Sequence, residues 1–323
     1  MDYTGIAGMT PEAHAFIKEW FEGGEYVIAH TSGSTGAPKE IRLLKRDMVA
    51  SARATNEFFG ISSSSVMGLP LSASYIAGKM MIVRSIVAGC RIHIARPGLN
   101  PLDEFPGDVR FDLLPIVPGQ IEGLLSATDV CGRVAAVIVG GAPMSTAQEA
   151  ALAASGIRAY ATYGMTETCS HVALRRIGAE DFFTALPGIS FDTDSRGCLV
   201  INAPGFSFGK ITTNDCVTLL SPSRFRWLGR ADNVINSGGI KVHPEELEQT
   251  LAPLLGDRAV FVTSRSSDRW GSEIILCVEG QGFNKDAFFA GVSKLLPRKL
   301  MPKEVVEIDC FKRTMSGKII RER

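Results

Sequence analysis

A glycine- and hydroxyl-rich loop that ends in a single lysine places the strongest constraint on this chain. It reads H-T-S-G-S-T-G-A-P-K-E-I and covers residues 30–41, directly after the apolar segment 26–29. Glycines let backbone N–H groups approach an anion, hydroxyls add donors, and a lysine supplies a mobile positive charge. The loop therefore predicts a phosphate site, with a solvated linker as the alternative for a run of this composition.

The order of the residues in this loop excludes the Walker type of phosphate site. That type follows G-x-x-x-x-G-K-[ST], with the lysine directly after the second glycine. Here Pro38 separates Gly36 from Lys39. A P-loop NTPase is therefore not expected, and the loop is a phosphate-binding candidate of another kind.

The composition is that of an ordinary globular protein. The 323 residues are 45% hydrophobic, which is enough for one large domain and one smaller domain. Lys plus Arg equals Asp plus Glu, at 34 each, so no overall field attracts nucleic acid or an anionic membrane. The seven cysteines are scattered without a C-x-x-C pair, which argues against a disulfide framework and against a zinc site.

The amino terminus and the apolar runs predict a cytoplasmic protein. The chain does not begin with a basic segment followed by an apolar one, and no apolar run reaches the ~18 residues of a membrane span. We therefore expect no membrane span. The sequence does not determine the oligomeric state, and a homodimer stays open.

Extended and helical patterns alternate along the first part of the chain. Thr10 and Pro11 form an N-cap and first-turn pair for a helix that ends at the glycine pair 23–24. Apolar runs and helical patterns then follow one another at 66–71, 77–88, 91–95, 133–139, 145–154 and 158–163. Such alternation predicts an α/β fold, with a large, doubly wound, mostly parallel sheet that carries helices on both faces.

A second domain is expected after Gly229. The pattern there changes to strands around two helices, 244–255 and 284–296, which is typical of a small α+β domain. We therefore predict two domains, residues 1–229 and residues 230–323. The segment 228–233 would form the junction between them.

A motif at the end of a predicted strand is a candidate ligand site. Tyr163 and Gly164 end this strand and lead to Thr166 and Glu167, and doubly wound sheets bind ligands at the carboxyl ends of their strands. An aromatic ring can stack on a base, and a carboxylate can hold a hard cation such as Mg²⁺. The segment 141–143 ends another strand. A simple surface turn is the alternative for both segments.

These motifs together resemble those of the adenylate-forming acyl- and aryl-CoA synthetases, the AMP-binding family. The loop is similar to T-S-G-[ST]-T-G-x-P-K, and Y-G-M-T-E-T at 163–168, G-R-A-D-N at 229–233 and S-G-K at 316–318 follow in the family's order. Two departures are visible. K-R-T at 312–314 stands where the family usually has a proline, and members usually carry a longer segment before the phosphate loop, so surface and oligomeric state are expected to differ.

The resemblance implies an acid–thiol ligase that uses ATP, Mg²⁺ and coenzyme A. The acid would become an acyl-adenylate with loss of pyrophosphate, and the CoA thiolate would then displace AMP. Lys318 would act at the α-phosphate, Glu167 and Thr166 would help to hold Mg²⁺, and residues 230–323 would be a mobile domain that carries the lysine. Contacts to nucleotide or CoA are implied for Thr31, Ser32, Gly33, Ser34, Thr35, Gly36, Lys39, Gly141, Ala142, Pro143, Tyr163, Gly164, Asp215, Arg230, Gly238 and Gly239.

The downstream residues of this set receive distinct roles from the resemblance. Asp215 would accept hydrogen bonds from the ribose hydroxyls, since a carboxylate suits a vicinal diol. Arg230 would lie near ribose and phosphate, and Asp232 would be the hinge. The glycine pair 238–239 would let the pantetheine arm of CoA lie against the backbone. A strand-end aspartate and a solvated terminal lysine are the structural alternatives.

The segment 69–84 occupies the place where relatives line the acyl pocket. The candidate substrate residues are Tyr75, Gly78, Arg84 and His171. A buried arginine would suit an aromatic acid with a second carboxylate, because guanidinium pairs bidentately with carboxylate. Together with Y-G-M-T-E-T-C-S-H at 163–171, this feature most resembles the o-succinylbenzoate-CoA ligases of menaquinone biosynthesis. An arginine at the surface and a histidine satisfied in the core are the alternatives.

Other functions stay open at this point. Another aryl- or fatty-acyl-CoA ligase would carry the same motifs. So would a stand-alone adenylation domain that loads a carrier protein, although the segment 75–79 lacks the aspartate that anchors an amino acid. A non-catalytic nucleotide-binding regulator would tend to lose Lys318 or Glu167, and both are present.

Overall fold

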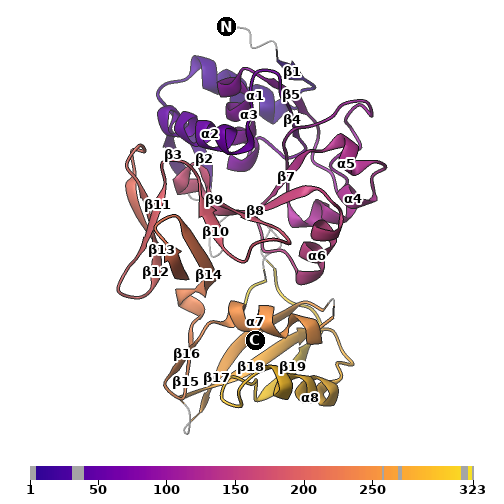
Figure 1. Ribbon diagram of the computed structural model, residues 1–323, viewed down its shortest axis with the longest axis vertical. Helices are drawn as coiled ribbons and strands as arrows, with labels where there is room; N and C mark the ends of the chain where they lie inside the picture. The colour runs from indigo at the N-terminus through magenta and orange to yellow at the C-terminus, as the bar shows by residue number, and fades with distance from the viewer. Residues whose placement is uncertain (1–4, 31–39, 257, 268–270, 314–318, 322–323) are drawn as a thin grey trace. The chain divides into compact units, whose positions relative to one another are not determined.

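The computed structural model describes residues 5–30, 40–256, 258–267, 271–313 and 319–321 (Figure 1). The chain divides into two compact units. The first comprises Met1–Asp192, Ile201–Ile211 and Leu220–Phe225, and the second comprises Thr193–Val200, Thr212–Leu219 and Arg226–Arg323. Segments between residues 193 and 230 thus alternate between the two units. The domain boundary at 229/230 stays a prediction.

The first unit alternates strands and helices, as the sequence predicts. Its elements are β1 (Ile6–Ala7), α1 (Pro11–Glu22), β2 (Tyr26–His30), β3 (Glu40–Leu44), α2 (Lys45–Phe59), β4 (Val66–Leu69), α3 (Ile76–Ala88), β5 (Arg91–Ile94), β6 (Leu114–Ile116), η1 (Pro118–Gln120), α4 (Ile121–Ser126), α5 (Val130–Arg133), β7 (Ala136–Val139), α6 (Thr146–Ala154), β8 (Arg158–Met165), η2 (Thr166–Thr168), β9 (Ser170–Arg176) and β10 (Phe183–Ala185). The strands β11 (Ser190–Thr193), β12 (Cys198–Ala203), β13 (Gly209–Ser221) and β14 (Arg224–Arg230) follow.

Sheet topology confirms the α/β class and refines it. Among the described residues, a small sheet of order β1-β5-β4 is parallel, and the large sheet has the order β11-β12-β13-β14-β10-β9-β8-β7-β6. Strands β6, β7 and β8 are parallel, but β8 pairs antiparallel with β9, and β9 with β10. The large sheet is therefore mixed rather than mostly parallel, because the strands after β8 return through short connections without α-helices.

Local sequence signals explain how the helices of this unit begin. The Thr10 hydroxyl accepts a hydrogen bond from the Ala13 amide at 3.3 Å, and proline occupies the first helical position of α1. Helix α6 begins with a reciprocal capping box between Ser145 and Gln148. Helix α3 packs on β4, β5 and α2 (Figure 1). Near its start, a Cβ atom on Gly78 would clash with the Ser72 carbonyl oxygen, so this position requires glycine.

The second unit is a small α+β assembly with its own core. Its elements after β14 are η3 (Ala231–Asn233), β15 (Ile235–Ser237), β16 (Ile240–Val242), α7 (Pro244–Leu251), η4 (Ala252–Leu254), β17 (Val260–Ser267), β18 (Gly271–Glu279), α8 (Lys285–Leu295) and β19 (Glu304–Ile308). Strand β18 pairs antiparallel with β17 and parallel with β19. Leu251, Ile274, Leu276 and Val292 are fully buried in the core between this sheet and the helices.

Candidate active site

A tight turn at the end of β8 presents Glu167. The Thr168 hydroxyl accepts from the Met165 amide at 3.0 Å and donates toward the Ser170 carbonyl at 2.7 Å, so the turn is closed on itself. Cys169 and Ser170 follow with φ of 60° and 123°, a conformation that non-glycine residues rarely adopt. Glu167 is exposed at this turn and has no ion-pair partner among the described residues. No described residue therefore neutralises this carboxylate.

Strand β8 also brings the other residues of this motif together with their neighbours. The Tyr163 ring lies 5.0 Å from Phe225 and 5.7 Å from Phe183, measured between ring centroids. A Cβ atom on Gly164 would clash with the Ser170 carbonyl oxygen of the paired strand β9. Glycine is therefore needed for this close approach, and the tyrosine ring is held by aromatic packing.

The segment 141–143 follows β7, the parallel neighbour of β8. In the register of these strands Val139 pairs with Ala161, and the Thr162 hydroxyl donates to the Val139 carbonyl oxygen at 3.2 Å. Gly141 has φ of 88°, which favours glycine. The structure thus places 141–143 and Tyr163 at the same edge of the sheet, where the sequence predicts them.

Arg84 is the most buried charged side chain of the candidate site. It lies on α3 with 1% of its surface exposed, and its guanidinium donates to the Ser170 hydroxyl at 3.3 Å and toward the Met81 sulfur at 3.4 Å. Among the described residues, its Nε has no hydrogen-bond partner and no carboxylate pairs with the guanidinium. Burial lowers the pKa of Arg84 to about 9. The surface alternative for this residue is therefore wrong.

His171 lies beside Arg84 in the same buried polar cluster. Its Nε2 is 3.1 Å from the Thr55 hydroxyl, and only 5% of its surface is exposed. Burial first, and then the positive charge of Arg84, hold the pKa of His171 well below its usual range. The imidazole is thus neutral, and Arg84 is the cation of this cluster.

Tyr75 differs from the other predicted substrate residues because it is exposed. It is the N-cap residue of α3, and 58% of its surface is accessible. Gly78 is buried one turn further along and packs against the backbone at Ser72. The structure therefore brings Arg84 and His171 together, places Tyr75 at the surface, and gives Gly78 a packing role.

In the second unit, Asp215 lies within an ionic cluster with Arg230 and with the predicted hinge residue Asp232. Arg230 is 3.7 Å from Asp215 and 3.1 Å from Asp232, measured between nitrogen and carboxylate oxygen. The Trp227 indole donates to Asp215 at 3.2 Å. The sequence reading missed Trp227. Its one signal is its position two residues after the buried Phe225 on β14, which puts both side chains on the same face of that strand. The sequence reading also missed Ser170, whose one signal is its place beside His171.

Glycines 238 and 239 form the turn of a two-stranded hairpin. They join β15 to β16 with φ of 57° and 80°, and Ser237 pairs with Ile240. Two consecutive residues with positive φ match a type I′ turn, which explains why both are glycine. Their predicted role toward CoA stays a prediction.

Several predicted residues lie outside the described part of the chain. These are Thr31, Ser32, Gly33, Ser34, Thr35, Gly36 and Lys39 of the phosphate loop, together with Lys318. Among the residues that the structure does describe, no group of three or more His, Cys, Asp and Glu side chains could hold a metal ion.

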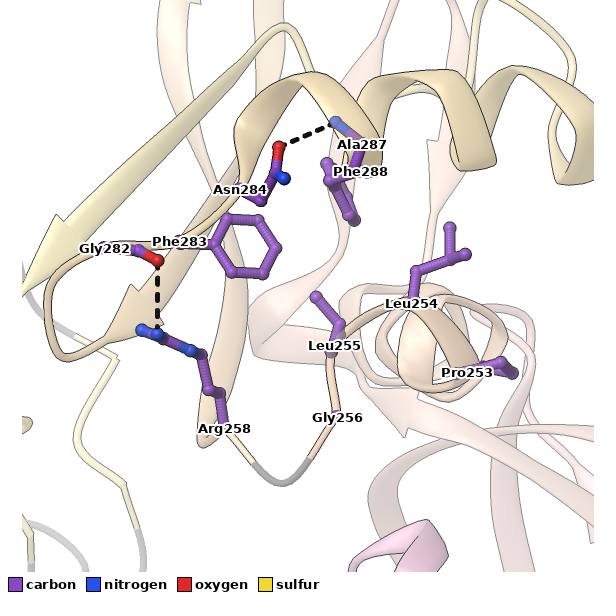
Figure 2. A pocket seen from close by; sticks show the side chains of 10 residues that line it. All are labelled: Pro253, Leu254, Leu255, Gly256, Arg258, Gly282, Phe283, Asn284, Ala287 and Phe288. Atoms are coloured by element: carbon purple, nitrogen blue, oxygen red, sulfur yellow. Dashed lines mark hydrogen bonds between the residues drawn. The ribbon is translucent and has the colours of Figure 1, made fainter.

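A pocket of about 430 Å³ lies elsewhere, in the second unit (Figure 2). Phe283, Phe288, Leu254 and Leu255 contribute its apolar surface. The Arg258 guanidinium at its edge donates to backbone carbonyls such as that of Gln281, at 3.1 Å. None of the predicted site residues lines this pocket.

Comparisons with known proteins support the family that the motifs resemble. The sequence profile described as AMP-binding enzyme matches residues 20–192, more than half of the 323 residues. The 2-succinylbenzoate–CoA ligase of Enterococcus faecalis is 26% identical over 334 residues, which cover 92% of this chain and 68% of the relative. No helix of the described residues is long and apolar enough to cross a membrane.

Solved structures extend the similarity to the whole chain. An acyl-CoA synthetase (AMP-forming)/AMP-acid ligase II-like protein from Dyadobacter fermentans is 31% identical, with a TM-score of 0.66 over 97% of this chain and 93% of its own. The o-succinylbenzoate CoA synthetase of Bacillus subtilis, bound to its acyl-adenylate intermediate, gives 0.78 at 18% identity over 91% and 67%. The predictions of an adenylate-forming enzyme and of its fold class are thereby confirmed. The chain belongs to the AMP-binding enzyme family.

Proposed function

We propose that the protein is an ATP-dependent acid–CoA ligase that converts 2-succinylbenzoate to its CoA thioester in menaquinone biosynthesis. The buried Arg84, which has no carboxylate partner among the described residues, carries the substrate assignment. The relatives named 2-succinylbenzoate–CoA ligase support it at 26% and 27% identity. A cytoplasmic location and a homodimer stay predictions.

The proposed chemistry follows from the low reactivity of a carboxylate. One carboxylate oxygen attacks the α-phosphorus of ATP, the bond to the β,γ-phosphates breaks, and pyrophosphate leaves. The CoA thiolate then attacks the acyl carbon, and AMP leaves with the bonding electrons. Positioning and charge stabilisation lower both barriers, because no residue forms a covalent bond in either step.

Residues of several motifs would bind the nucleotide. The loop 31–39 would bind the departing phosphates, and Lys318 would stabilise charge at the α-phosphate. Asp215 would accept from the ribose hydroxyls in addition to Trp227. Glu167 and Thr166 would hold Mg²⁺, whose charge neutralises phosphate oxygens. The exposed Glu167 carboxylate, which has no ion-pair partner among the described residues, fits this role.

The electrostatics around Arg84 favour an acid that carries a second carboxylate. A buried cation without an anion has lost hydration without gaining a partner, so an incoming anion recovers that free energy. His171 is neutral and cannot compete for the anion. 2-Succinylbenzoate can place one carboxylate at the reaction centre and the other at Arg84, whereas benzoate and fatty acids have only one.

CoA-dependent AMP release tests this proposal. Wild type and Lys318→Ala are assayed with ATP, Mg²⁺ and each of three acids: 2-succinylbenzoate, benzoate and octanoate. We expect selective turnover of 2-succinylbenzoate and at least a ~100-fold loss of adenylation without Lys318. Turnover of a monocarboxylate alone would keep the ligase and overturn the role of Arg84. AMP release with none of a wider set of acids would overturn the ligase itself.

A further inference from the structure

Glu245 is a buried carboxylate that no step of the proposed reaction uses. It lies in the first turn of α7 with 8% of its surface exposed. Its Oε1 accepts a hydrogen bond from the Asn233 side-chain amide at 2.5 Å. Its Oε2 is buried and has no hydrogen-bond partner among the described residues. An unsatisfied buried oxygen costs free energy and requires a reason.

The carboxylate is packed against the backbone of the predicted hinge. Gly229 has φ of 149°, and a Cβ atom there would clash with the Glu245 Oε2. Asn233 lies four residues further along, at the end of η3. Glu245 therefore contacts both ends of the segment 229–233, one through packing and the other through a hydrogen bond.

The same side chain reaches toward the carboxyl-terminal segment. A guanidinium nitrogen of Arg321 is 3.5 Å from the Glu245 Oε1. Arg321 also pairs bidentately with Glu248, at 2.5 and 2.8 Å, and donates to the Val262 carbonyl oxygen at 3.2 Å. The Val262 amide in turn donates to Glu248 at 2.6 Å. Arg321 is thus anchored on α7 and β17 by charge-assisted hydrogen bonds.

We propose that Glu245 is a positioning residue that couples the hinge segment 229–233 to Arg321. Arg321 follows Lys318 by three positions, so a change at the hinge is transmitted to the chain next to that lysine. This inference rests on the proposed function and on the mobile domain 230–323 that the family resemblance implies, whose hinge arrangement would differ between adenylation and thioester formation. Removing the carboxylate lets the two segments adjust independently, and this changes the balance between the half-reactions.

The kinetic test separates the two half-reactions. Acid-dependent ATP–pyrophosphate exchange reports adenylation, and AMP release from preformed 2-succinylbenzoyl-adenylate with CoA reports thioester formation. We expect Glu245→Ala to change the ratio of the two rates at least ~5-fold, with Glu245→Gln between it and wild type, because glutamine still accepts from Asn233 but loses the charge toward Arg321. The exposed neighbour on the same helix, Glu246→Ala, is the matched control and leaves the ratio unchanged. An equal loss in both half-reactions, or no change in either, would overturn the coupling.

Amide hydrogen exchange of the unliganded protein gives a second readout that does not depend on activity. Glu245→Ala should accelerate exchange both at 229–233 and at 319–321, whereas Glu246→Ala should accelerate it at neither. Faster exchange confined to α7 would mean a local structural role and would overturn the coupling. If wild type activates no acid, the proposed function fails, and this exchange pattern still decides whether the link exists.

Discussion

Arg230 and Arg84, two predicted ligand-binding arginines, differ in whether carboxylates compensate their positive charge. Arg230 has 46% of its side chain exposed and lies within ion-pair distance of Asp215 and Asp232. Arg84 is 1% exposed, touches a hydroxyl and a thioether sulfur, and has no carboxylate partner among the described residues. Among the described residues, carboxylates compensate the charge of Arg230 but not the charge of Arg84.

This difference indicates which arginine would gain more free energy from binding an anionic ligand. An exposed ion pair is hydrated and contributes little to stability, so its geometry adapts when a nucleotide arrives. A buried cation without an anion costs free energy in the unliganded protein, and a ligand carboxylate removes that cost. We therefore assign acid selectivity to Arg84, and nucleotide binding to Arg230 and Asp215.

The largest effect is expected from Arg84→Met. A charge-assisted hydrogen bond contributes up to ~3 kcal/mol, so kcat/KM for 2-succinylbenzoate should fall by roughly 100-fold. The change replaces a buried charge by an apolar side chain of similar length, and the protein should stay folded. AMP release with 2-succinylbenzoate and with benzoate measures it. An equal loss for both acids would break the contrast between the two arginines.

The next largest effect, a change in KM for ATP, is expected from Asp215→Asn. Asparagine keeps the acceptor for Trp227 but weakens the charge-assisted bonds to the ribose, so KM for ATP should rise about tenfold, or ~1.4 kcal/mol. Relative selectivity among acids should not change. Asp194→Asn, at a partly buried carboxylate paired with Arg196, serves as the control for a lost carboxylate in this unit. A change of acid selectivity in the Asp215 variant would contradict the assignment.

The neutral state of His171 predicts how stability depends on pH. The unfolded chain binds a proton at this residue near pH 6.5, whereas the folded protein, with its lowered pKa, does not. Stability from this group should therefore be complete above pH 6.5 and fall below it, by about 1 kcal/mol between pH 6.5 and 5.5. Urea unfolding of wild type and His171→Gln measures the difference. The exposed His14→Gln is the control and should retain the wild-type dependence.

The smallest effect is expected for the stability of Arg230→Gln. The Arg230 side chain is 46% exposed, so solvent screens its ion pairs with Asp215 and Asp232 to about 0.5 kcal/mol, and Trp227 still donates to Asp215 in the variant. Urea unfolding at pH 7.5 should therefore show a small shift of the midpoint. A loss of more than about 2 kcal/mol in the free energy of unfolding would mean that the ion pairs of Arg230 are not screened by solvent. The comparison with Arg84 would then fail.

Local features of the fold were predictable from the sequence. Thr10 with Pro11 acts within a few residues of itself, so this helix start appears in the structure where the sequence predicts it. The capping box of Ser145 with Gln148 and the turn at 238–239 are equally local, but they were recognised only in the structure. The antiparallel half of the large sheet was not predicted. Its strands pair through contacts whose stability depends on their neighbours rather than on an intrinsic preference.

By itself, the sequence determined the family, through motifs whose order survives low overall identity, and it named Arg84, His171, Asp215 and Arg230 as candidates. Only the tertiary structure decided how deeply these residues are buried and which partners they contact. His171 meets Thr55 across 116 positions, and Arg84 meets Ser170 across 86. Burial and charge pairing depend on such distant partners, because solvent exclusion is a property of the packed chain and not of a residue.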